Sequence, residues 1–113
     1  MHELSVTQSL LEIALRHAEP AGANRITDLH LVIGEFATIV DDSVQFYWDM
    51  ISEGTKAEGA RLHFQRTSAL MHCLDCDHSF EPDEGELLCP VCAGARIQLI
   101  KGDEFFLESI DVI

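Results

Sequence analysis

Two short cysteine motifs decide the fold of this chain: Cys73-Leu74-Asp75-Cys76 and, twelve residues later, Cys89-Pro90-Val91-Cys92. Each Cys-x-x-Cys turn aims two thiolates at one point, and two such turns that face each other form a tetrahedral four-sulfur site with Zn–S distances of about 2.3 Å. Because four protein ligands leave no open position for substrate or water, such a site favours a structural role. The spacing therefore predicts a structural zinc site formed by the four cysteines.

Three other chemistries use pairs of this motif. The second motif resembles half of a rubredoxin knuckle, so an iron site for electron transfer is an alternative, although shielding aromatic residues are sparse here. A thioredoxin-like redox pair would need one motif to open a helix, which the surrounding acids and prolines do not favour. A nucleic-acid zinc ribbon needs basic side chains, but the segment 73–92 contains six acids and no Lys or Arg.

The composition describes a small, acidic, globular chain. Its 113 residues include 20 Asp and Glu against 7 Lys and Arg, for a formal charge of −13, and 47% of the residues are hydrophobic. A chain of this length buries roughly 65% of its unfolded surface, enough for one core but hardly for two, so a second module needs another source of stability. The charge argues against nucleic acid and favours a cation or a basic protein surface as partner.

The sequence also indicates where the protein works. Its apolar stretches fall far short of the roughly 20 residues that span a bilayer, so no membrane helix is expected. The opening residues Met1-His2-Glu3-Leu4-Ser5 lack the basic and apolar regions of a secretory signal. We therefore expect a cytoplasmic protein, in which four cysteines favour metal binding over disulfides.

Two amphipathic helices are predicted. The first lies within residues 3–19, with a capping-box pattern at Ser5 and Gln8 and a stop at Pro20. The second is expected to begin at an N-cap within 41–43 and to end at a Gly54 C-cap. Their predicted apolar faces are Leu4, Leu11, Leu15 and Ala18, flanked by Leu10 and Ala14, in the first helix and Val44, Tyr47, Trp48 and Ile51 in the second.

Three strands are predicted, over residues 28–34, 60–67 and 104–113. Alternation in the first two places His30 and His63 opposite the apolar side chains, which favours exposed or cross-strand polar roles for both. The inward face of the third strand stays open, because both sets of alternating residues are apolar. The simplest arrangement is an α+β fold: a small module of two helices and a three-stranded sheet (residues 1–68 with 102–113), into which a zinc-ribbon-like module with the four cysteines (69–101) is inserted.

The first residues form a second candidate metal site. A free α-amine, the next amide nitrogen and the Nδ1 atom of a histidine at position 2 can close adjacent chelate rings around one divalent ion. The amide of Glu3 can fill a fourth, planar position, and planar nitrogen sites suit Ni(II) and Cu(II). The alternative is that His2 is simply an exposed terminal residue.

Several motifs together resemble one family over essentially the whole chain. They are an opening Met1-His2-Glu3 before an amphipathic helix, Ile33-Gly34-Glu35 at a strand end, Ala57-Glu58-Gly59-Ala60 before a strand, and the two Cys-x-x-Cys knuckles. This pattern is similar to that of the HypA/HybF family of hydrogenase nickel-incorporation proteins. The resemblance implies a small cytosolic metallochaperone with a nickel-binding domain and a zinc domain, and no catalytic activity.

The resemblance also assigns residues and partners. It makes His2 the principal nickel ligand, with Met1 completing the site and Glu3 adding a carboxylate or contacting a partner. It makes the four cysteines the zinc ligands. The expected function is delivery of Ni(II) to the [NiFe]-hydrogenase large-subunit precursor together with a maturation GTPase, and some members also serve urease maturation. The competing hypothesis is a zinc-ribbon adaptor for protein interactions, without metal delivery.

Overall fold

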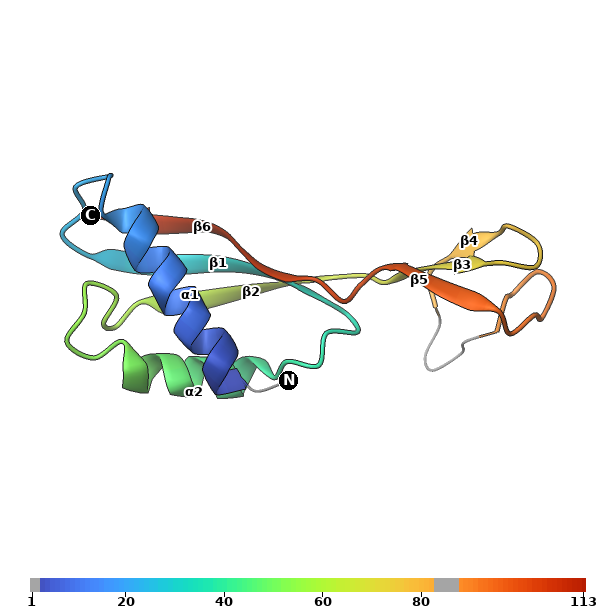
Figure 1. Ribbon diagram of the computed structural model, residues 1–113, viewed down its shortest axis with the longest axis horizontal. Helices are drawn as coiled ribbons and strands as arrows, with labels where there is room; N and C mark the ends of the chain where they lie inside the picture. Colours follow the sequence, from blue (N-terminus) through green and yellow to red (C-terminus); the bar gives the residue numbers. More distant parts are fainter. Residues whose placement is uncertain (1–2, 83–87) are drawn as a thin grey trace. The chain divides into compact units, whose positions relative to one another are not determined.

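The structure, a computed structural model, describes residues 3–82 and 88–113 and contains two helices and six strands there. The strands form two three-stranded sheets, in the orders β2-β1-β6 and β4-β3-β5. The predicted α+β fold with an inserted four-cysteine module is therefore confirmed. In chain order (Figure 1) the elements are α1 (Glu3–Ala18), β1 (Ile26–Gly34), α2 (Asp41–Ile51), β2 (Arg61–Thr67), β3 (Leu70–Cys73), β4 (Ser79–Phe80), β5 (Ile97–Lys101) and β6 (Phe105–Val112).

The chain divides into two compact units. The first comprises Met1–Val32, Thr38–Gln65 and Phe106–Ile113, and the second comprises Ile33–Ala37 and Arg66–Phe105. The predicted zinc segment, 69–101, lies inside the second unit, which also takes up a short piece of chain after β1. Neither helix in the described part of the chain is long and apolar enough to cross a membrane.

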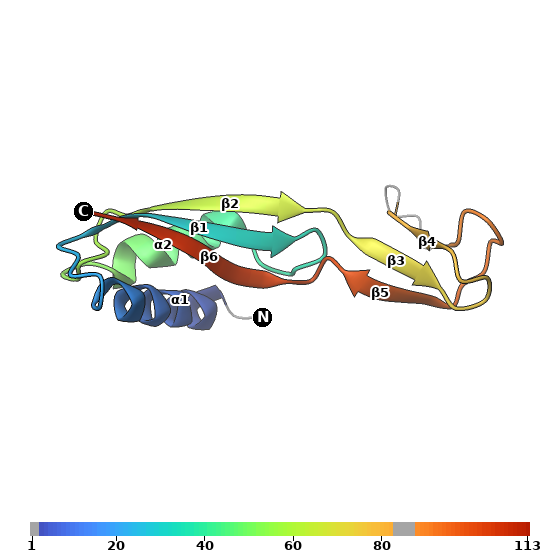
Figure 2. The ribbon, with the colours of Figure 1, turned by 90° about the horizontal axis from the view of Figure 1, so that it is seen from above.

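The first unit packs both helices on one face of the β2-β1-β6 sheet (Figure 2). Its core combines Leu29 and Leu31 of β1 with Val44 and Trp48 of α2, all at most 1% exposed. The buried stripe of α1 is Thr7, Leu10, Ala14 and Ala18. The residues predicted to flank the apolar face of α1 therefore lie at its centre.

Both helices begin differently from the prediction. The first starts at Glu3, so Ser5 lies inside the helix and the predicted capping box is wrong. The N-cap of α2 is Val40, an extended residue whose side chain makes no capping hydrogen bond. Asp41 and Asp42 instead lie in the first helical turn, where their negative charges suit the positive end of the helix dipole.

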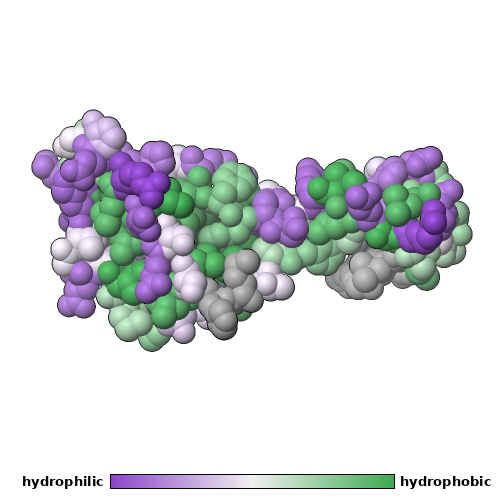
Figure 3. Space-filling model, viewed as in Figure 1, coloured by the Kyte–Doolittle hydropathy of each residue, from purple (hydrophilic) through white to green (hydrophobic). Residues whose placement is uncertain are grey.

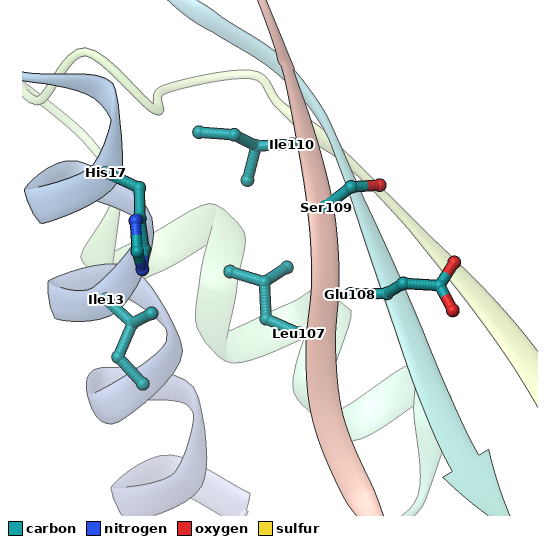
Figure 4. A pocket seen from close by; sticks show the side chains of 6 residues that line it. All are labelled: Ile13, His17, Leu107, Glu108, Ser109 and Ile110. Atoms are coloured by element: carbon teal, nitrogen blue, oxygen red, sulfur yellow. The ribbon is translucent and has the colours of Figure 1, made fainter. Parts of the chain in front are cut away.

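The inward face of β6 is settled by the structure. Leu107 and Ile110 point toward α1, whereas Glu108 and Ser109, between them, point away (Figure 4). Two inward residues three positions apart cannot arise from strict alternation, which is why the sequence pattern was ambiguous. A hollow of about 230 Å³ lies between the strand and the helix, and its lining includes Ile13 and His17 of α1.

The second unit has a small core around β3. This strand pairs antiparallel with both neighbours, and Met71 lies opposite Phe80 of β4 and Leu99 of β5. The buried residues of this cluster are Met71, Cys73, Phe80 and Cys89, with Ile97 and Leu99 packed against them. Sequence periodicity did not predict this second sheet, because its strands are only two to five residues long.

Two glycines of the second unit, Gly34 and Gly102, allow two chain segments to approach closely. The Gly34 N–H donates to the Glu104 carbonyl oxygen at 2.7 Å, and the Phe36 N–H donates to the Gly102 carbonyl oxygen at 2.6 Å. A Cβ atom on Gly34 would lie 2.2 Å from the backbone of Gly102, which has a positive φ of 129°. Only glycine fits this contact, which gives a structural reason for the Ile33-Gly34-Glu35 motif.

Candidate metal centre

The four cysteines come together in the second unit. Their Sγ atoms all lie within 4.8 Å of one another. The Sγ atoms of Cys73 and Cys92 are 3.6 Å apart, and those of Cys76 and Cys89 are 3.5 Å apart. A tetrahedral Zn–S₄ site with bonds near 2.3 Å has S–S edges of about 3.8 Å. The donor set and its spacing therefore fit a zinc ion.

The two knuckles repeat the same backbone pattern. In the first, the Asp77 N–H donates to the Cys73 carbonyl at 2.9 Å and the Cys73 N–H donates to the His78 carbonyl at 2.8 Å. In the second, the Ala93 N–H donates to the Cys89 carbonyl at 2.9 Å and the Cys89 N–H donates to the Gly94 carbonyl at 3.0 Å. Asp77 and Ala93, each directly after a motif, have positive φ angles of 60° and 59°. Each turn is thus closed by a residue in the left-handed region.

Neither of these strained residues was predicted. Aspartate is enriched in the left-handed region, so Asp77 carried a weak signal, but Ala93 carried none. The better signal was Gly94, where an added Cβ atom would lie 2.7 Å from an Asp75 carboxylate oxygen and 3.1 Å from the Cys92 sulfur. A glycine directly behind a knuckle marks this close approach of backbone and ligands.

An ion pair ties the first knuckle to the chain before β5. The Arg96 Nε atom lies 2.8 Å from Asp75 Oδ1. The Leu74 N–H donates to the Arg96 carbonyl at 2.9 Å. This backbone bond and the ion pair join the Cys73–Cys76 turn to the segment before β5.

The site is buried on one side and open on the other. Cys73 and Cys89 are buried, whereas Cys76 and Cys92 are exposed. The tips of both knuckles carry exposed apolar side chains, Leu74 at 48% and Val91 at 67%, among the apolar residues that reach the surface of this unit (Figure 3). The first cysteine of each motif therefore anchors the core, and the second faces solvent.

The thiols have divergent acidities. For Cys89, burial would raise the pKa, but hydrogen bonds from the backbone of Cys92 and Val91 and from neighbouring thiols outweigh it and lower the pKa to about 7. For Cys76, the hydrogen bond from the His78 backbone lowers the pKa, but desolvation by the surrounding cluster and the three neighbouring sulfurs raise it to about 12. Four thiolates this close repel one another, so a divalent cation is needed to hold all four deprotonated.

Of the residues predicted for nickel, the structure describes only Glu3, which lies in the first unit. Met1 and His2 lie outside the described residues. Glu3 is the first residue of α1 and is half-buried, and its carbonyl accepts a hydrogen bond from Thr7 Oγ1 at 2.5 Å. Within 3–82 and 88–113, the cysteine cluster is the one group of three or more potential metal-ligating side chains whose ligand atoms all lie close enough together to share one ion.

Comparison with known proteins gives one consistent result. The family described as hydrogenase/urease nickel incorporation, metallochaperone HypA, matches residues 1–112. A hydrogenase maturation factor HypA of Dehalococcoides mccartyi is 46% identical over 112 residues, covering 99% of this chain and 94% of the relative. The hydrogenase maturation factor HybF of Escherichia coli O6:H1 is 36% identical and covers 99% of both chains.

A solved structure shares the fold. The solution structure of the Ni metallochaperone HypA from Helicobacter pylori superposes with a TM-score of 0.70 at 24% identity, covering 100% of this chain and 98% of that one. At this level of identity the likeness concerns the fold, and it extends over both units of the chain.

Proposed function

Because the chain belongs to the HypA family of nickel metallochaperones for hydrogenase maturation, which are not enzymes, we propose that it binds Ni(II) at its own N-terminus and delivers it to a [NiFe]-hydrogenase large-subunit precursor. The ligands are the Met1 amine, the backbone amides of His2 and Glu3, and the His2 imidazole. The full-length family match, together with a Met1-His2-Glu3 opening, is the observation that carries this proposal.

The start of α1 supports this ligand set. Since the helix begins at Glu3, the amide of Glu3 is among the first four N–H groups of the helix, which have no intrahelical acceptor. Its nitrogen is therefore available to a metal. An amide that loses its proton to bind nickel becomes an anion, and the positive end of the helix dipole stabilises an anion there.

Nickel release follows from the same ligands. The imidazole must be neutral and the amides deprotonated to bind, so protons compete with the metal. Nickel affinity should fall as the pH drops toward and below the ordinary histidine pKa of about 6.5. A terminal site also lets a partner replace the ligands one at a time, which suits delivery. Nitrogen donors of this kind prefer Cu(II) over Ni(II), so availability and the partner set the identity of the metal.

In the second unit, Cys73, Cys76, Cys89 and Cys92 hold a zinc ion with a structural role. When bound, zinc supplies the positive charge that keeps four close thiolates deprotonated. The two-domain assignment follows, with nickel on the helical domain (residues 1–68 and 102–113) and zinc on the knuckle domain (69–101). The S–S separations of 3.5 and 3.6 Å support this role.

The partners proposed are those of hydrogenase maturation: a maturation GTPase, the hydrogenase large-subunit precursor and urease maturation proteins, all in the cytoplasm. Glu3 supplies either a carboxylate to nickel or a contact to the GTPase. The formal charge of −13 is compatible with basic protein surfaces and disfavours nucleic acid.

Metal stoichiometry of untagged, full-length protein tests the proposal. We expect one zinc that resists dilution and one exchangeable nickel per chain, measured by native mass spectrometry and nickel titration. His2→Ala should abolish the nickel equivalent and leave zinc unchanged, and adding two residues ahead of Met1 should do the same. His17→Gln, an exposed histidine of α1, is the matched control and should bind nickel as the parent does.

Unchanged nickel stoichiometry in His2→Ala would overturn the terminal site. Zinc without any exchangeable nickel in the parent would favour the adaptor hypothesis instead. A nickel titration with the same affinity at pH 8 and pH 6 would contradict the release mechanism while leaving the site itself standing.

A further inference from the structure

Two histidines and two aspartates form a cluster on the face of the first sheet that the helices leave uncovered. The His63 Nε2 atom of β2 lies 2.7 Å from Asp28 Oδ2 of β1, and the His30 Nε2 atom of β1 lies 2.8 Å from Asp111 Oδ2 of β6. The cluster thus links all three strands. Both imidazoles are partly open to solvent, with side chains 39% (His30) and 43% (His63) exposed.

The carboxylates fix the tautomer of both rings. An ionised carboxylate can only accept hydrogen bonds, so each Nε2 atom must carry the proton. When the imidazoles are neutral, both Nδ1 atoms therefore present a lone pair. Neither Nδ1 atom has a partner within the described residues. Metal-binding histidines typically show this arrangement, in which one ring nitrogen donates to a carboxylate and the other binds the ion.

The separation of the rings suits a shared ion. The two ring centroids are 4.9 Å apart, and the ring planes are 13° from parallel. A metal 2.0–2.1 Å from an imidazole nitrogen lies about 3.2 Å from the ring centroid. Two such rings on one ion have centroids roughly 4.5 Å apart at a ligand angle of 90° and roughly 5.2 Å apart at the tetrahedral angle. The observed separation lies between these values. Because the two rings stack face to face, each ring must turn out of the stack, with its carboxylate moving along, before both lone pairs meet at one ion.

Charge favours a cation at this place. With neutral imidazoles the cluster carries the two negative charges of Asp28 and Asp111. The hydrogen bond from His63, the largest influence, and one from Thr27 lower the pKa of Asp28, so this carboxylate stays ionised near neutral pH. A divalent ion held by the two imidazoles would balance the charge.

We propose that His30 and His63 form a further divalent-metal site on the open face of the first sheet, with their Nδ1 atoms as ligands and with Asp111 and Asp28 as positioning residues. Imidazole donors suit Zn(II) rather than Mg(II) or Ca(II), and we assign Zn(II) to this site. Water completes the coordination, so the site binds more weakly than the four-cysteine centre and exchanges its metal readily. It is independent of the terminal nickel site.

Zinc titration of the His2→Ala protein tests this site by itself. The protein is first loaded with one zinc, which fills the cysteine centre, and Zn(II) alone is then added while side-chain ¹H–¹⁵N correlations of the histidines are recorded. We expect one further equivalent to bind and to shift the Nδ1 resonances of His30 and His63, with Nε2 still protonated. Asp28→Asn should weaken this second equivalent by about 10- to 100-fold while both histidines still respond.

Matched variants separate the site from general surface binding. His30→Gln and His63→Gln should each abolish the second zinc, whereas His17→Gln should leave it unchanged. Trp48 fluorescence, which reports the buried core of this unit, checks that each variant is folded. If a glutamine variant fails to fold, the Nδ1 shifts of the parent decide. Absence of a second zinc, a second zinc that persists in both glutamine variants, or one that leaves both Nδ1 resonances unmoved would overturn the proposal.

Discussion

The two units of this chain bury very different cores. The first unit encloses large apolar side chains from two helices and a sheet, including Trp48, Leu29 and Leu31 at 0–1% exposure. In the second unit, two of the four buried residues of the cluster around β3 are cysteines of the metal centre, Cys73 and Cys89. A cluster in which half the buried residues are ionisable thiols cannot supply the apolar burial that stabilises the first unit. The difference indicates that one unit folds by hydrophobic burial and the other by metal binding.

Loss of zinc should produce the largest difference in stability between the two units. Cys73→Ser removes a ligand at the end of β3, and structural zinc contributes about 10–16 kcal/mol of apparent binding free energy in small domains. We expect the amide NMR signals of the second unit to collapse while Trp48 fluorescence stays native. The only Trp and the only Tyr of the chain lie in the first unit, so fluorescence reports that unit alone.

A variant that keeps all four thiols is the control for this experiment. His78 lies two positions after Cys76, and its ring stacks on Phe80. His78→Gln should retain zinc and the amide NMR signals of the second unit. Loss of native Trp48 fluorescence in Cys73→Ser would mean that the two units do not fold separately.

A substitution in the core of the first unit should destabilise that unit and leave the second unchanged, with a smaller loss of free energy than the loss of zinc. Leu29 is fully buried in the first unit, and Leu29→Ala should lower the free energy of unfolding by about 2–5 kcal/mol through lost burial and the cavity left behind. Urea unfolding followed by Trp48 fluorescence measures this loss. Zinc release, followed with a chromogenic chelator, should stay at the denaturant concentration of the parent.

An exposed apolar residue of the same unit provides the matched control. Phe46 of α2 is 64% exposed, so Phe46→Ala should change the free energy of unfolding by less than about 0.5 kcal/mol. A Leu29→Ala protein that releases zinc at the same lowered urea concentration at which Trp48 becomes exposed would show one cooperative transition and would contradict the division.

The sequence predicted the parts of this structure that depend on local patterns. Two helices, three strands of the first sheet and the convergence of four cysteines follow from periodicity and from the Cys-x-x-Cys spacing, and all are confirmed. The cross-strand polar roles expected for His30 and His63 are confirmed as well. Each of these features follows from a spacing of a few residues, which can be recognised in the sequence itself.

Features that depend on distant partners were missed. Thr7 is fully buried although it is polar, because its hydroxyl donates to the carbonyl of Glu3, and the predicted apolar face of α1 did not include it. The second sheet joins Met71 to Phe80 and to Leu99, pairings that no local period records. The pairing of each imidazole with a carboxylate on a neighbouring strand likewise appears only once the strands are assembled.

The smallest expected effect concerns a carboxylate that binds backbone and side chain in the second unit. The Glu104 carboxylate accepts hydrogen bonds from Thr67 Oγ1 at 2.5 Å and from the Gly102 N–H at 2.8 Å. The Thr67 bond, the larger influence, and the Gly102 bond lower the pKa of Glu104 below its ordinary value of 4.5. As the pH falls, the unfolded chain therefore takes up this proton first. The stabilisation from Glu104 is complete above about pH 4.5 and is lost as the pH falls through the folded-state pKa.

Glu104→Gln should thus be less stable than the parent at pH 6.5, and the difference should shrink toward pH 4. The Gly34 and Phe36 amides donate to the backbone carbonyls of Glu104 and Gly102. Their hydrogen-exchange rates therefore measure this difference in stability within the second unit. Glu12→Gln, in an exposed ion pair of α1, serves as control, because any acid-induced loss of zinc affects both variants alike. A pH-independent difference would mean that the charge of Glu104 contributes nothing. A difference that shrinks would show that the second unit also depends on hydrogen bonds to a partly buried carboxylate, whereas the first unit depends on apolar packing.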